Sequence, residues 1–158
     1  MEAGRTIGLQ DAPYRSPTER LEVIARRLHD DRDCWLITGN VARGPHAVPL
    51  SFLADSRRVI LATAAERPAA RNVLEESRVL LLLAGYGDAV RLSGGASLAP
   101  FEDLDEDVRS RYLAKAGWNP ASAGFVALIV TLAEIRCSRS PAEDEDQVVW
   151  RAGAPIPW

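Results

Sequence analysis

The sequence predicts a single, mainly β domain with flanking helices, built on an antiparallel sheet or barrel. Its 158 residues suffice for one domain with its own core. Short apolar segments recur along the chain, and most are separated by short turns. That order is typical of antiparallel strands and speaks against a βαβ array. The hydrophobic fraction of 47% and the charged fraction of 26% are ordinary for a folded domain.

Charge and cysteine content narrow the function classes. The net charge is −3 and no run of lysine or arginine appears, so the electrostatic footprint of a nucleic-acid-binding protein is missing. Cys34 and Cys137 each lie in an apolar segment and form no CxxC pair, which predicts buried free thiols. Residues 1–11 lack the apolar region of a signal peptide, and no apolar run reaches the ~20 residues of a membrane span. We therefore expect a cytoplasmic protein.

Residues 1–15 are predicted to form a lead-in to one domain over 16–158. The first helix of that domain has three start signals. Ser16 can cap the helix, Pro17 suits its first position, and Glu19 completes a capping box. Apolar residues then recur at helical spacing, at Leu21, Ile24, Ala25 and Leu28.

Three strands joined by turns are predicted next. Their apolar, β-rich segments are 34–38, 47–53 and 58–63. The polar and glycine-containing stretches between them are the predicted turns. Pro49 lies inside the second strand, where it cannot donate to a ladder, so an edge or a bulge is expected there.

Two further helices are predicted in the second half of the chain. A short helix over 67–76 should turn Val73 and Leu74 toward the core. A longer helix over 104–116 should be capped by Asp103. Both helices interrupt the series of strands and are expected to pack on the outside of the sheet or barrel.

The remaining strands are predicted at 79–83, 89–98, 125–137 and 147–151. The first of these is apolar at every position, as in a strand buried on both faces. Gly94 and Gly95 interrupt the second and indicate a bulge or a barrel corner. The acidic stretch 141–146 is expected to be a solvated loop.

Motifs for catalysis by side chains alone are absent. The sequence contains no GxGxxG, no P-loop, no GxSxG and no metal-ligand spacing among its histidines and cysteines. His29 follows the apolar stripe of the first helix and is expected to be solvated. We therefore predict no catalytic side chain and no metal ligand, and any chemistry would come from a bound cofactor.

Several short motifs follow one another in an order that resembles a known family. They are a W-L-x-T strand, a Gly-Pro-His turn with its strand, an Arg-Asn helix and an Arg-Val strand start, at 35–38, 44–52, 71–74 and 78–79. The segments 112–120 and 149–153 are also similar. The chain thus resembles the flavin and deazaflavin split barrels of the pyridoxamine 5′-phosphate oxidase-like superfamily, in an actinobacterial branch. The resemblance covers roughly residues 18–158.

This resemblance implies a six-stranded antiparallel split β-barrel that forms a homodimer. It also implies FMN, or the deazaflavin F420 as the alternative, in a groove at the dimer interface. The function it implies is that of an oxidoreductase acting on an unknown small molecule.

Within this resemblance, particular residues are predicted to hold the cofactor. A flavin ring needs an apolar wall with backbone donors and acceptors. The strand around His46, Val48, Pro49, Leu50 and Ser51 is predicted to supply it. A phosphate needs guanidinium groups, hydroxyls and free N–H groups at a helix start. The predicted cradle consists of Thr63, Arg67, Arg71 and Asn72, and Trp118 is predicted either to cover the cofactor of the partner subunit or to plug the core.

The chain departs from the pattern of this branch between Thr63 and Asn72. Arg67 and Ala69 stand where the branch carries a serine and a threonine. The sequence therefore leaves FMN, F420 and no cofactor as open alternatives. A second interpretation is a non-catalytic cofactor- or haem-binding module on the same barrel, with His46 as the axial ligand.

Overall fold

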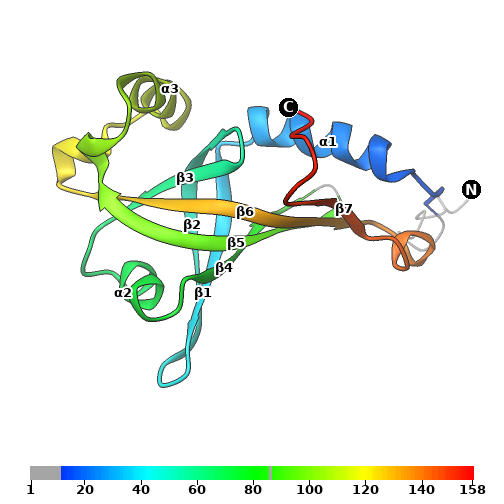
Figure 1. Cartoon of the computed structure of the whole chain (residues 1–158), viewed down its shortest axis with the longest axis horizontal. Coiled ribbons are helices and arrows are strands. Elements are labelled where there is room, and N and C mark those ends of the chain that lie inside the picture. The colour runs from blue at the N-terminus through cyan, green and yellow to red at the C-terminus, as the bar shows by residue number, and fades with distance from the viewer. Residues whose placement is uncertain (1–11, 86) are drawn as a thin grey trace, which may run out of the picture.

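The structure is a computed structural model that describes residues 12–85 and 87–158 (Figure 1). Its helices are α1 (Pro17–Asp30), α2 (Pro68–Glu75) and α3 (Glu106–Ala116). Its strands are β1 (Asp33–Asn40), β2 (Gly44–Asp55), β3 (Arg58–Thr63), β4 (Arg78–Leu83), β5 (Ala89–Pro100), β6 (Val126–Ser138) and β7 (Val148–Arg151). Short 3₁₀ turns occur at Phe101–Asp103, Pro120–Ala123 and Pro141–Glu143. None of the described helices combines the length and the apolar character needed to cross a membrane.

Six of the strands close into an antiparallel barrel. Neighbours follow the order β3-β2-β1-β4-β5-β6, and the first half of β6 pairs back onto β3, with Ile129 opposite Ile60. β7 pairs with β6 further along, at Glu134–Arg136, where β3 has ended. The prediction of a mainly β antiparallel barrel with flanking helices is confirmed.

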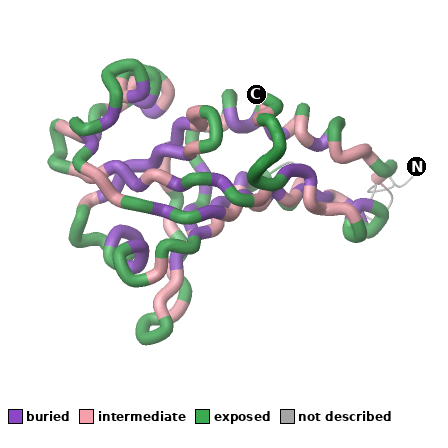
Figure 2. The backbone as a smooth tube through the Cα atoms, viewed as in Figure 1, coloured by how far each residue is buried: buried purple, intermediate pink, exposed green. Residues whose placement is uncertain are grey.

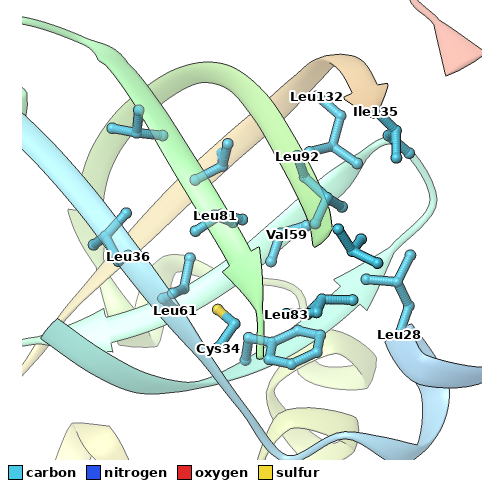
Figure 3. Packing of buried hydrophobic residues seen from close by; sticks show 14 of the residues in the cluster. Leu28, Cys34, Leu36, Val59, Leu61, Leu81, Leu83, Leu92, Leu132 and Ile135 are labelled. Carbon is cyan, nitrogen blue, oxygen red and sulfur yellow. The ribbon is translucent and has the colours of Figure 1, made fainter. Parts of the chain in front are cut away.

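Alternate residues of the strands fill the barrel (Figure 3). The side chains that converge there include Leu36, Val59, Leu61, Leu81, Leu92 and Leu132, and α1 adds Ile24 and Leu28. Burial of each such side chain contributes about 1.5–3 kcal/mol of favourable transfer free energy. Cys34 and Cys137 are buried free thiols, as predicted.

A second apolar cluster lies between the outer face of the barrel and α3. Ile60 and Ala127 contribute from the barrel, and Val108 and Tyr112 from the helix. The rings of Tyr112 and Phe101 meet edge to face, with centroids 5.2 Å apart. The tube coloured by burial shows buried segments both along the strands and on the inner side of α3 (Figure 2). This packing fixes α3 and the loop after it against β2 and β3.

The first helix begins as its sequence predicts, whereas the other two differ in detail. Ser16 accepts from the Glu19 N–H and Glu19 accepts from the Ser16 N–H, which completes the capping box. Leu74 is 74% exposed, so the prediction that it faces the core is wrong. The eight-residue α2 can bury only one face, and Ala69, Ala70 and Val73 occupy it. Asp103 does not cap α3 either, because a 3₁₀ turn takes up Phe101–Asp103 and the helix starts after Asp105.

Two predictions about burial are also wrong. β4 is not buried on both faces, since Leu80 and Leu82 point outward from the barrel and are half-buried. The acidic stretch is not wholly solvated, because Glu143 is fully buried. Burial by itself would raise the pKa of Glu143, but hydrogen bonds from Arg15 and from the Arg139 N–H outweigh it and lower that pKa. Arg15 thereby ties the chain before α1 to the segment before β7.

The predicted bulge at the paired glycines is confirmed. The register between β5 and β6 shifts between Ser93 and Gly94. A Cβ atom on Gly94 would lie 2.1 Å from the Thr131 carbonyl oxygen, whereas one on Gly95 would meet nothing within 4 Å. The close approach of two backbones therefore requires glycine at the first position only.

Candidate functional site

The barrel is open along one side of β2. Residues 44–51 of this strand pair with β1, and only 52–55 pair with β3. In the described part of the chain, no strand pairs with the other edge of 44–51. Pro49 lies in this free edge, which confirms the predicted edge position. The backbone N–H and C=O groups along such an edge are available to a ligand.

A cavity of about 630 Å³ lies beside the free edge of β2. Its other walls are the end of β3, the start of α2 and the loop between α3 and β6. Eight of the predicted site residues line it, namely His46, Val48, Pro49, Leu50, Ser51, Thr63, Arg67 and Trp118. Segments far apart in the sequence thus form one groove, and the structure brings most of the predicted site together.

The start of α2 gives one end of the groove a positive character. Arg67 is the residue before the helix and Pro68 its first residue, so the N–H groups of Ala69 and Ala70 lack partners within the helix. Among the described residues, the exposed guanidinium groups of Arg67 and Arg71 have no hydrogen-bond or ion-pair partner. A helix start with uncompensated guanidinium groups attracts anions such as phosphate.

Asn72 and Arg71 lie outside this cavity. Asn72 is buried and its amide is engaged within the fold. Its Nδ2 donates to Thr38 Oγ1 at 3.0 Å, and its Oδ1 accepts from Arg43 Nη2 at 3.0 Å. Asn72 therefore fastens α2 to β1 and to the β1–β2 hairpin. Arg71 is exposed on α2 and does not line the groove.

Two aromatic rings close the groove on the side of α3. Trp118 and Phe125 meet edge to face, with ring centroids 5.4 Å apart, and both line the cavity. Both also pack against the cluster beneath α3. Trp118 thus packs against its own subunit and, from the same position, presents surface to the groove.

A polar cluster marks the other end of the groove. Ser51 Oγ donates to Asp33 Oδ1 at 2.8 Å, and Arg32 Nε lies 3.7 Å from the same carboxylate oxygen. The Tyr112 hydroxyl donates to the Ser51 carbonyl oxygen at 3.1 Å and anchors this part of β2. Burial raises the pKa of Tyr112, so the phenol stays protonated and keeps that hydrogen bond.

Sequence reasoning missed several lining residues. They are Arg32, Asp33, Ala62, Ala64, Pro68, Ala69 and Phe125. Ala64, Pro68 and Ala69 fall inside the stretch predicted to hold phosphate and could have been included with it. Asp33 faces Ser51 across the β1–β2 ladder, so the strand register would have found it. Phe125 carried no separate signal, because its place depends on how α3 packs.

Comparison with known proteins supports this picture of the fold. The family described as pyridoxamine 5′-phosphate oxidase matches residues 21–138. No curated protein matches the sequence.

Solved structures with the same fold are described as proteins of different functions. One is a putative pyridoxamine 5′-phosphate oxidase from Listeria innocua, with 23% identity, a TM-score of 0.60, and coverage of 77% of this chain and 99% of that one. A haem-binding protein from Mycobacterium smegmatis shares 15% identity with a TM-score of 0.62, over 82% of this chain and 57% of that one. An F420 reductase shares 13% identity with a TM-score of 0.58, over 70% of this chain and 93% of that one. The family match over residues 21–138, together with the barrel opened along β2, shows that this chain belongs to the pyridoxamine 5′-phosphate oxidase family and has its split β-barrel fold.

Proposed function

We propose that this chain binds a flavin-type cofactor in the groove beside β2 and works as an oxidoreductase on a small molecule. FMN is the first candidate and F420 the alternative. The observation that carries the proposal is the meeting, in one cavity, of a free strand edge and the start of α2, where Arg67 has no partner among the residues that the structure describes. Family membership and the likeness to an F420 reductase support it.

The residues present fit such a group. The cavity of about 630 Å³ falls in the range of roughly 300–1,000 Å³ usual for small-molecule sites. Val48, Leu50 and Trp118 offer apolar surface to a ring, and the free edge of β2 offers backbone donors and acceptors. Arg67 and the first N–H groups of α2 would hold the phosphate, so a guanidinium group takes the place of the missing hydroxyls. When bound, the flavin supplies the electron transfer, while the protein orients it and keeps water from the ring.

We further propose that the protein works as a homodimer. Trp35 and Ile37 of β1 lie directly opposite Leu82 and Leu80 of β4, and all four point out of the barrel. Trp35 is 42% exposed. An apolar patch on the outer face of a barrel is typical of a surface that another subunit covers.

The proposal is tested by cofactor binding to the purified protein. Titration with FMN and with F420, followed by flavin fluorescence and by the absorbance retained after desalting, should give saturable binding of one of them. Arg67→Ala should weaken it about tenfold to a hundredfold, the usual cost of a lost charge-assisted hydrogen bond. Arg26→Ala, at an exposed site on α1, is the matched control and should leave it unchanged. Equal binding by both variants, or none by the wild type, would contradict the proposed cradle.

A haem-binding module is the second candidate, and His46 favours it. This imidazole lines the groove and, among the described residues, has no hydrogen-bond partner, so it is available as an axial ligand. The fold likeness to a haem-binding protein points the same way. Incubation with haemin should then give a Soret band that His46→Ala abolishes and that Arg67→Ala retains. The absence of haem uptake would sink this candidate and leave the flavin proposal standing.

A further inference from the structure

A separate cavity of about 440 Å³ lies where the end of α1 meets α3, and it contains the only lysine of the sequence. Its lining residues are Leu28, His29, Leu53, Ala54, Arg111, Ala114 and Lys115. None of them lines the groove beside β2. The proposed function therefore makes no use of this lysine.

The Lys115 amine is held in a defined place. Its Nζ donates to the Leu28 carbonyl oxygen of α1 at 2.6 Å and lies 3.9 Å from the centroid of the buried Phe52 ring. No carboxylate in 12–85 or 87–158 forms an ion pair with it. The amine is thus half-buried, oriented by a carbonyl and an aromatic face, and open to the cavity.

None of the described charged groups around the Lys115 amine pairs with it directly. Asp30 and Asp31 at the end of α1 act on it from a distance. Burial raises the pKa of Cys34 on β1, so this side chain stays an uncharged thiol. His29 contacts Asp30. Arg111, which lies on α3 as Lys115 does, is paired with Asp55 and Asp107. Burial lowers the pKa of Lys115 to about 8, against the opposite pull of the carboxylates. A usable share of the amine is therefore uncharged, and nucleophilic, near neutral pH.

We propose that Lys115 is a site of reversible imine formation with a small, largely apolar aldehyde that enters this cavity. The amine nitrogen attacks the carbonyl carbon and forms the C–N bond. The carbonyl oxygen takes up the two amine protons and leaves as water, so that a C=N bond remains. No oxidant or reductant is needed.

The surroundings favour an imine over other lysine adducts. The imine nitrogen then takes up a proton from solvent. The protonated imine carries a positive charge and one N–H, so it has both the Phe52 ring face and the Leu28 carbonyl as partners. An acyl group would leave a neutral amide, and carbon dioxide would give an anionic carbamate, against a ring face that prefers cations. The side chains of Leu28, Leu53 and Ala114 suit the apolar body of an aldehyde.

The test is a competition within one molecule. The variant Arg26→Lys adds a second lysine at an exposed site on α1, away from the cavity. This protein is treated at pH 7 with benzaldehyde and cyanoborohydride, and the benzylated peptides are quantified by mass spectrometry. Lys115 should be labelled at least about tenfold faster than position 26, since its lowered pKa leaves far more uncharged amine.

A second variant checks the assignment. Lys115→Arg keeps the cation and a donor for Leu28 but removes the nucleophile, so all labelling of that peptide should disappear while the N-terminal amine still reacts. Slower or equal labelling of Lys115 relative to position 26 would overturn the proposal, and this comparison needs no change at Lys115 itself. Neither arm involves the groove, so failure here and failure of cofactor binding are distinguishable.

Discussion

Asn72 was predicted to bind the cofactor, but its hydrogen bonds within the fold indicate a structural role. Its amide is shared between Thr38 of β1 and Arg43 of the hairpin. Asn72→Ala leaves the buried Thr38 hydroxyl without this partner, so the free energy of unfolding should fall by about 1–3 kcal/mol in urea denaturation. Leu74→Ala, on the exposed face of the same helix, should change it by less than about 0.5 kcal/mol. A stable Asn72→Ala protein with weakened cofactor binding would instead show that the amide contacts the ligand.

At this scale, the short motif predicted which segment lines the groove but not the direction of every side chain in it. Arg67 and Thr63 were expected beside a phosphate, and both line the groove. Asn72 follows the same motif, but its orientation depends on the register of β1 and on the hairpin tip, which no local pattern contains. Leu74 is a similar case, because the hydrophobicity of one residue does not reveal which face of a short helix packs inward.

Among the elements, the β5–β6 bulge makes the sharpest prediction. A Cβ atom at Gly94 would collide with the Thr131 carbonyl oxygen at 2.1 Å, so β5 and β6 would have to separate locally. Gly94→Ala should therefore lower the free energy of unfolding by about 1–3 kcal/mol or more. Gly95→Ala is the matched control, since its Cβ meets open space and should cost much less. Equal thermal midpoints for the two variants would contradict the close approach.

The existence of the elements could be predicted because each has a local signature. The capping box at Ser16, the paired glycines and Pro49 each indicated a feature that the structure contains. The first and last residues of the strands were harder to predict. β2, for example, runs from Gly44 to Asp55 and changes its pairing partner from β1 to β3 at Phe52. That change of partner opens the groove, and it follows from the twist and closure of the whole barrel.

On the scale of the whole molecule, closure of the barrel could be expected only from the family resemblance, and the burial of distant charges could not be predicted from the sequence. Pairing of β3 with β6 joins segments that no local pattern connects. The ion pair between Arg15 and Glu143 likewise brings the segment before α1 to the segment before β7, and this contact explains why an acidic residue could be fully buried. The patch on β1 and β4 could be predicted in part. Its apolar residues are evident in the sequence, but their outward direction depends on how the barrel closes.

That patch leads to a prediction about the assembly. Trp35 projects from the outer face that it forms with Ile37, Leu80 and Leu82, and a charge placed there would have to be desolvated if a second copy covers it. The wild-type protein should sediment as a dimer, and Trp35→Glu should raise the dimer dissociation constant at least about a hundredfold, the usual range for loss of a buried aromatic anchor. Val41→Glu, at the fully exposed hairpin tip, is the matched control and should remain a dimer. If Trp35→Glu dimerises as tightly as the wild type, the second copy docks elsewhere; if the wild type is monomeric, the groove beside β2 must bind its ligand with residues of one chain alone.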